Sequence, residues 1–104
     1  MTNFKSIIEY PRDGVLSKEL ARTDKTNVTL FSMAKGSEIS EHTSTKEGVL
    51  LVLEGDGTFN LAGKDIGMKQ GVFIHLKKGI VHALKARKNT SFILCLYEAD
   101  RQLK

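Results

Sequence analysis

Nine glycines are spread along this chain, and they divide it into segments that are mostly too short for helices. The segments carry alternating or continuous apolar residues, which is the pattern of β-strands bounded by turns. Strands are predicted at residues 28–35, 48–53, 58–61, 65–68, 72–76, 80–86 and 91–97. The sequence therefore predicts an all-β chain with antiparallel pairing.

Glycine-containing turns predict how the central strands are joined. Residues 54–57 and 62–64 supply the glycines that tight hairpin turns need for positive φ. Residues 48–68 are therefore predicted to form a three-stranded meander.

The beginning of the chain is less regular. Four apolar residues between positions 4 and 10 predict a short strand, which ends in a turn at residues 11–14. A second strand is predicted at residues 15–23, and a helix is the alternative for this region. With 104 residues, the chain has the length of one domain.

Charge and apolar runs exclude two classes of partner. The 16 Lys and Arg residues against 12 Asp and Glu residues give a net charge of +4, and the basic residues are scattered. Scattered charge indicates a solvated surface, so no nucleic acid is expected as a partner. The longest apolar runs, 49–53 and 92–97, are too short to cross a membrane as helices, so no membrane partner is expected.

The location is predicted from the single cysteine and the first residues. Cys95 has no second cysteine to pair with, so an intrachain disulfide is excluded and a reducing compartment is favoured. Lys5 and Glu9 lie where a signal peptide needs an apolar core. Both observations favour the cytoplasm.

Strand alternation predicts which side chains point inward. In residues 80–86, His82 shares a face with apolar neighbours, whereas the opposite face carries Lys85, so His82 is predicted to point into the core. His75 is predicted to lie outside, on the surface or in a subunit contact. Residues 91–97 are apolar on both faces, which predicts that this strand is covered both by the core and by a second layer or partner.

Two spaced motifs resemble those of the cupin superfamily, and specifically of its small single-domain, RmlC-like members. The first reads Gly36-x5-His42-x-Ser44-x3-Gly48-x6-Gly55, where the family pattern has His at the position of Ser44 and Glu at that of Gly48. The second reads Gly71-x5-Lys77-x-Gly79-x2-His82-x3-Ala86, where the family has Pro in place of Lys77 and Asn in place of Ala86. The spacing is kept without a gap over about half of the chain.

The resemblance implies the fold and the assembly. It implies a single-domain double-stranded β-helix, the jelly-roll cupin barrel, formed by residues 28–104. Residues 1–27 are then N-terminal strands or an extension that contacts a second copy, because small cupins commonly form homodimers through sheet faces and exchanged N-terminal strands. The apolar residues between positions 4 and 10 agree with such a contact.

The resemblance also implies a reduced metal site. The family's four ligands hold a divalent transition metal, Fe, Mn, Ni, Cu or Zn, and here only His42 and His82 remain. Glu38, Glu47 and Glu54 are candidates for a third ligand, although alternation turns Glu47 to the opposite face unless a bulge intervenes. Cys95 is expected to pack as a small hydrophobe rather than to bind a metal.

A ligand pocket is expected around the two histidines. Leu50, Val52 and Leu84 are expected to supply its apolar walls. Ser40 and Ser44 are expected to supply hydrogen bonds, and Lys77 a positive charge near the mouth.

Three functions follow from this set of residues. The first is a metal-dependent dioxygenase or isomerase acting on a small molecule. The second is a metal-free barrel that binds or senses a small molecule without catalysis. The third is an interaction module whose barrel interior is filled by its own side chains.

Overall fold

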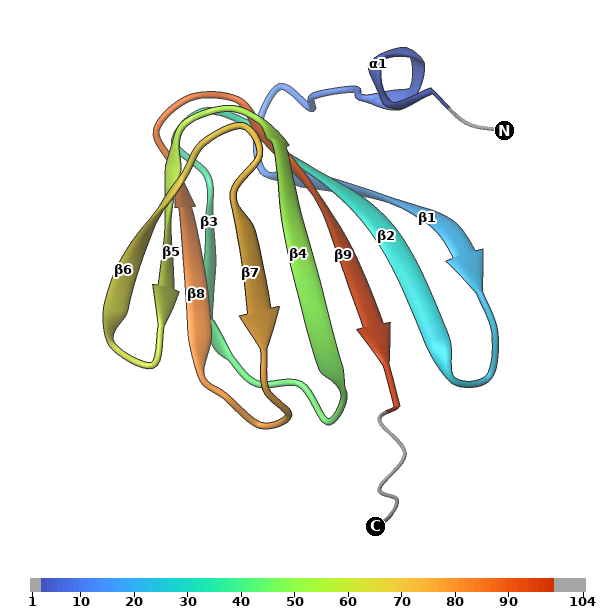
Figure 1. Cartoon of the computed structure of the whole chain (residues 1–104). Helices are drawn as coiled ribbons and strands as arrows, with labels where there is room; N and C mark the ends of the chain where they lie inside the picture. The colour runs from blue at the N-terminus through green and yellow to red at the C-terminus, as the bar shows by residue number, and fades with distance from the viewer. Residues whose placement is uncertain (1–2, 99–104) are drawn as a thin grey trace, which may run out of the picture.

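The computed structural model describes residues 3–98, which form two antiparallel sheets that face each other (Figure 1). One sheet has the strand order β1-β2-β9-β4-β7 and the other has the order β3-β8-β5-β6. The strands are β1 (Val15–Arg22), β2 (Thr26–Met33), β3 (Glu38–His42), β4 (Glu47–Glu54), β5 (Gly57–Leu61), β6 (Lys64–Met68), β7 (Phe73–Leu76), β8 (His82–Ala86) and β9 (Thr90–Tyr97). We call them the five-stranded and four-stranded sheets.

The core lies between the two sheets. Its fully buried members include Phe59 on β5 and Phe92 on β9, which come from opposite sheets. Every strand pair is antiparallel. The chain passes between the sheets in the connections that follow β2, β3, β4, β6, β7 and β8, so the fold is the predicted all-β jelly roll.

The three-stranded meander predicted at residues 48–68 is wrong. Strand β4 pairs with β7 and β9, whereas β5 pairs with β6 and β8, so only the β5–β6 hairpin forms. The chain changes sheet at Gly55, where φ is 124° and an added Cβ would lie 2.5 Å from the Cα of Thr90. Only glycine fits there without strain, so this glycine marks a crossing between sheets rather than a hairpin. Gly36 in the first motif and Gly71 and Gly79 in the second motif also have positive φ.

The strand predicted within residues 4–10 is also wrong. These residues form a one-turn helix, α1 (Phe4–Ile7), because the side chain of Asn3 accepts a hydrogen bond from the backbone of Lys5 and caps the turn. Strand β1 follows where a strand was predicted. The boundary drawn between residues 27 and 28 falls inside β2, and the ends of the predicted ranges, 1–2 and 99–104, lie outside the described residues.

Strand β3 was not predicted as a strand, because its side chains do not alternate. Its pairing with β8 shifts register between Ile39 and His42, which indicates a β-bulge. The remaining strands were predicted with small errors at their ends. No helix among residues 3–98 has the length and apolar character needed to cross a membrane.

The two ends of the sandwich are built differently. At one end, which we call the Asp56 end, the backbone carbonyl of Asp56 accepts hydrogen bonds from the backbone N–H groups of Arg87 and Lys88 at 2.9 and 3.1 Å. At the other end, which we call the histidine end, the backbone N–H of Gly79 donates to the carbonyl of Ser44 at 2.9 Å. The Asp56 end is at the top of Figure 1 and the histidine end is at the bottom.

Candidate functional site

The two motif histidines meet at the histidine end. His42 at the end of β3 lies opposite His82 at the start of β8, and their ring centroids are 4.1 Å apart in an edge-to-face arrangement. The bulge in β3 makes this contact, because it lets Ile39 and His42 both face inward although their positions differ by an odd number. The inward orientation predicted for His82 is confirmed.

Backbone hydrogen bonds determine which nitrogen of each ring carries the proton. The Nδ1 atom of His42 is 2.8 Å from the carbonyl oxygen of Ser40, and that of His82 is 3.0 Å from the carbonyl oxygen of Ile80. A carbonyl oxygen only accepts, so each Nδ1 donates a proton. The neutral rings therefore present Nε2 as an acceptor, and no hydrogen bond within residues 3–98 uses either Nε2 atom.

His82 is held in an apolar environment. It is 5% exposed, and its ring stacks on Phe59 with a centroid distance of 5.6 Å and an interplanar angle of 7°. Burial is the largest cause that lowers the pKa of His82 below its ordinary value, and the neighbouring His42 acts in the same direction. His82 is therefore a neutral imidazole at physiological pH.

A cavity of about 90 Å³ lies between the sheets beside the two rings. His42 is exposed, so the two histidines stand where the cavity meets solvent. All other lining residues are apolar, and they come from both sheets: Phe31, Ile39, Leu50, Phe59, Leu76, Leu84, Phe92 and Leu94. The cavity is thus an apolar space with two imidazoles at one side.

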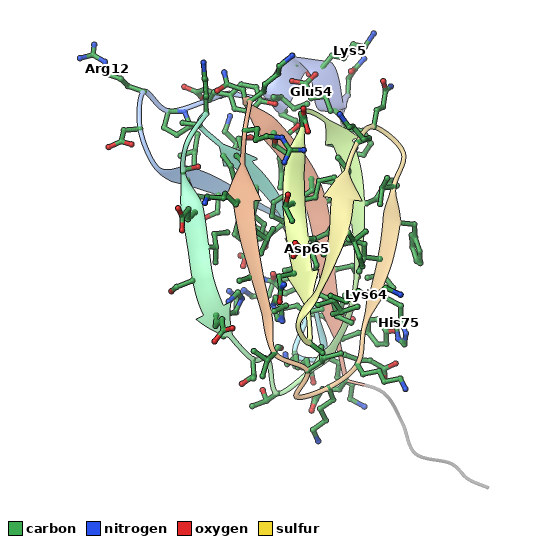
Figure 2. All side chains as sticks on the ribbon, turned by 90° about the vertical axis from the view of Figure 1, so that its left-hand side faces the viewer. Lys5, Arg12, Glu54, Lys64, Asp65 and His75 are labelled. Atoms are coloured by element: carbon green, nitrogen blue, oxygen red, sulfur yellow. The ribbon has the colours of Figure 1, made fainter. Side chains whose placement is uncertain are left out.

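The three candidate carboxylates do not reach this cavity. Glu47 lies on the outer face and accepts a hydrogen bond from His75 Nε2 at 2.7 Å, so His75 is outside as predicted (Figure 2). Glu38 pairs with Lys85 on the outer face of the four-stranded sheet, with 3.6 Å between their charged atoms. Glu54 accepts a hydrogen bond from the hydroxyl of Tyr10 at 2.6 Å.

Glu38 and Glu54, two of the third-ligand candidates, face away from the cavity. Parity holds only in a regular strand, and the register shifts between Ile39 and His42 in β3 and between Val52 and Glu54 in β4. Because of these bulges, Glu38 and Glu54 do not share the inward face of the strand with the residues that have the same parity. Figure 2 shows Glu54 beside α1, at the Asp56 end of the molecule.

Ser44 and Gly48, which replace two metal ligands of the family pattern, make other contacts in this structure. The hydroxyl oxygen of Ser44 accepts a hydrogen bond from the backbone N–H of Lys46 at 3.1 Å, so it caps a turn. Gly48 faces Leu96 across the sheet, and a Cβ added to Gly48 would lie 2.8 Å from Leu96 Cδ2. The side chain of Leu96 thus occupies the space next to the position where the family has a glutamate.

The remaining pocket predictions are partly confirmed. Leu50 and Leu84 line the cavity, whereas Val52 is buried in the core away from it. Ser40 contributes its carbonyl oxygen to His42, but its side chain lies on the exposed surface. Lys77 is exposed in a turn and does not line the cavity.

Sequence reasoning missed several apolar lining residues. Phe31, Phe59 and Phe92 each alternate with polar or outward-facing neighbours, so the signal for an inward orientation was present in their strands. Cys95 does not join the core cluster; it is half-buried on the outer face of β9.

The donor set is incomplete for a resident transition metal. Among residues 3–98, no group of three or more His, Cys, Asp and Glu side chains is arranged to hold a metal ion. Catalytic zinc sites use three protein ligands and structural sites use four. The site offers two imidazoles, and Leu96 stands beside the position where the family pattern has a carboxylate.

The sequence comparison agrees with this architecture. A family model described as Cupin domain matches residues 29–97. The chain belongs to the cupin family. No curated protein matches its sequence.

Solved structures share the fold of this cupin. A conserved protein of unknown function from Streptococcus pyogenes has 24% identity and a TM-score of 0.86, with 97% of this chain and 89% of that chain covered. A cupin superfamily protein from Desulfitobacterium hafniense has 23% identity and a TM-score of 0.85, with coverages of 90% and 86%. A mutant salicylate 1,2-dioxygenase from Pseudoaminobacter salicylatoxidans has 13% identity and a TM-score of 0.76, with coverages of 81% and 26%. At these identities the likeness shows the fold alone.

Proposed function

We propose that this cupin binds a small molecule in its barrel without a resident metal, and that His42 and His82 hold the ligand directly. One observation carries the proposal: both Nδ1 atoms donate to backbone carbonyls, which leaves two Nε2 acceptors beside an otherwise apolar cavity. Such a cavity with a few convergent polar groups is typical of a small-molecule site.

The donor set supports binding without a metal. Two of the four positions that carry metal ligands in the family cannot supply one here: Ser44 caps a turn and Gly48 is packed against Leu96. The carboxylates considered as replacements are engaged on outer faces. A metal held here would depend on two imidazoles and on water.

A metal-dependent dioxygenase or isomerase is the second candidate function. It is favoured by the contact between His42 and His82, since two imidazoles with available Nε2 atoms are half of the family's ligand set. A metal would supply Lewis-acid or redox chemistry there. The protein would contribute the two imidazoles and an apolar space that excludes water from the substrate.

Metal analysis separates the two candidates. The protein is purified without a histidine tag, incubated in turn with iron, manganese, nickel, copper and zinc, and then freed of unbound metal. We expect a metal content far below one ion per chain, equal in the wild type and in His42→Ala and His82→Ala. One ion per wild-type chain that is lost in both variants would establish the metal-dependent candidate instead.

We also propose the cytoplasm as the location. Cys95 is a free thiol on a half-buried surface, and a reducing compartment keeps such a thiol from oxidation. Fractionation of cells that express the untagged protein tests this proposal.

A further inference from the structure

We infer that the cavity takes an uncharged, mostly apolar molecule with one hydroxyl group rather than a carboxylate. This inference rests on the proposed function, and it deepens it by naming the ligand class. It follows from the apolar lining of the cavity, from the hydrogen-bonding state of the two rings and from the fact that no lining residue is a lysine or an arginine.

The apolar part of the ligand is defined by the walls. Phe31 and Phe92 stack with ring centroids 5.2 Å apart, and both line the cavity together with Leu50 and Leu94. A ligand that contacts these walls must be apolar there, because a polar group would lose its water without a hydrogen bond in return.

The polar part of the ligand is defined by the two rings. Each Nε2 is an acceptor because the Nδ1 of the same ring donates to a backbone carbonyl. An acceptor needs a donor as its partner, and a hydroxyl group is a donor that carries no charge. A carboxylate offers only acceptors, so it would face the Nε2 lone pairs without a hydrogen bond.

The lining also lacks a positive charge that could attract a carboxylate. None of the residues that line the cavity is Lys or Arg. Lys77 and Lys78 are exposed in the turn between β7 and β8. A buried carboxylate without a cation is costly, so the cavity disfavours an anion.

Size restricts the ligand to a small molecule. An engineered apolar cavity of about 150 Å³ holds benzene. The present cavity of about 90 Å³ is smaller but opens to solvent beside the exposed His42. A single substituted ring with its hydroxyl at the histidines is the upper limit that we infer.

Three compounds of similar shape test the ligand class: phenol, toluene and benzoate. Binding is measured by calorimetry and by thermal unfolding at pH 8, where an imidazole of ordinary pKa is uncharged. We expect phenol to bind about tenfold more tightly than toluene, the effect of one good hydrogen bond, and benzoate to bind more weakly than either. In the double variant His42→Leu/His82→Phe, which removes both acceptors, the preference for phenol over toluene should fall toward onefold while toluene still binds.

The controls separate failure of the ligand class from failure of the proposed function. His42 is exposed, so its replacement is not expected to unfold the protein, and Lys77→Ala should leave all three affinities unchanged. If benzoate binds more tightly than phenol, the ligand class is wrong although the cavity binds small molecules. If none of the three compounds binds, both the ligand class and the proposed function are wrong.

Discussion

The Asp56 end and the histidine end of the barrel differ in how much space they leave. At the Asp56 end, Cβ atoms added to Gly55 and Gly57 would lie 2.5 Å from the Cα of Thr90 and 2.6 Å from the carbonyl oxygen of Lys85. At the histidine end, His42 is exposed beside a cavity of about 90 Å³.

This difference separates the residues that hold the fold from those that form the site. The backbone contacts that join the sheets at the Asp56 end need small residues and tolerate no change in shape. The histidine end can exchange side chains without loss of those contacts. Gly55 of the first motif belongs to the crowded Asp56 end, whereas Ser44 and Gly48, which replace two ligand positions of the family, lie toward the histidine end.

The largest expected effect is that of Gly55→Ala. The substitution combines a strained positive φ with a backbone overlap at 2.5 Å, so we expect it to lower the free energy of unfolding by about 3 kcal/mol. Gly71→Ala is the control: its φ is also positive, at 87°, but nothing lies within 4 Å of the added Cβ. Its expected cost is about 1 kcal/mol. Equal costs in urea unfolding would contradict a tightly packed Asp56 end.

The next effect concerns the space beside Gly48. Gly48→Ala brings a Cβ to 2.8 Å from Leu96 Cδ2, so we expect a loss of about 1 to 2 kcal/mol in the free energy of unfolding. In a Leu96→Ala background the same change should cost less, and the remaining cost comes from the carbonyl oxygen of Cys95, which would lie 3.2 Å from the added Cβ. A double-mutant cycle measures this coupling, which we expect to be about 1 kcal/mol. Additive costs would show that Leu96 is not what fills this position.

A smaller effect is expected from the protonation of His82. Its pKa is lowered in the folded state, so the unfolded chain binds the proton more tightly. The stability that depends on neutral His82 is fully present above the ordinary histidine pKa of about 6.5. It is lost as the pH falls from there through the lowered pKa.

Thermal unfolding from pH 8 to pH 5 measures this dependence. We expect the midpoint temperature of the wild type to fall in the acidic part of the range and that of His82→Phe to fall less. His75→Phe is the control for a histidine on the outer face. The same slope in the wild type and in His82→Phe would contradict a buried neutral ring.

The smallest expected effect is that of the side-chain charges at the Asp56 end. The hydrogen bond from Arg87 is the main cause that lowers the pKa of Asp56, and Lys69 is a further partner at 3.3 Å. Asp56→Asn keeps the backbone carbonyl that joins the turns. We therefore expect less destabilisation than in either glycine variant, and none in high salt, where exposed ion pairs are screened. A loss as large as that of Gly55→Ala would mean that the side chain, rather than the backbone, holds this end together.

Much of the fold could be predicted from the sequence, because it depends on local signals. Alternation in residues 80–86 predicted that His82 points inward, and the resemblance to cupins implied that His42 lies near it. The errors arose where pairing is not local. The turn after β4 has the residues of a hairpin, but Gly55 leads to the opposite sheet, because β4 pairs with the distant strands β7 and β9 and β5 pairs with β6 and β8.

The candidate site was predicted less completely, because bulges interrupt strand parity. A bulge depends on how a strand fits its partner, so nothing in residues 38–42 alone shows that Glu38 and His42 face opposite ways. The same holds for Glu54 after the irregularity in β4. The orientation of these carboxylates decides whether the site has two donors or three.

The sequence by itself determined that the chain forms short strands joined by glycine turns, that its motifs have cupin spacing and that His82 lies inside. These properties follow from backbone freedom at glycine and from alternation, which act over a few residues. Only the tertiary structure decided that Leu96 fills the space beside Gly48 and that Glu47 and Glu54 are bound by His75 and Tyr10 outside the cavity. Both depend on side chains far apart in the chain, and their contacts are set by how the two sheets and the N-terminal segment pack together.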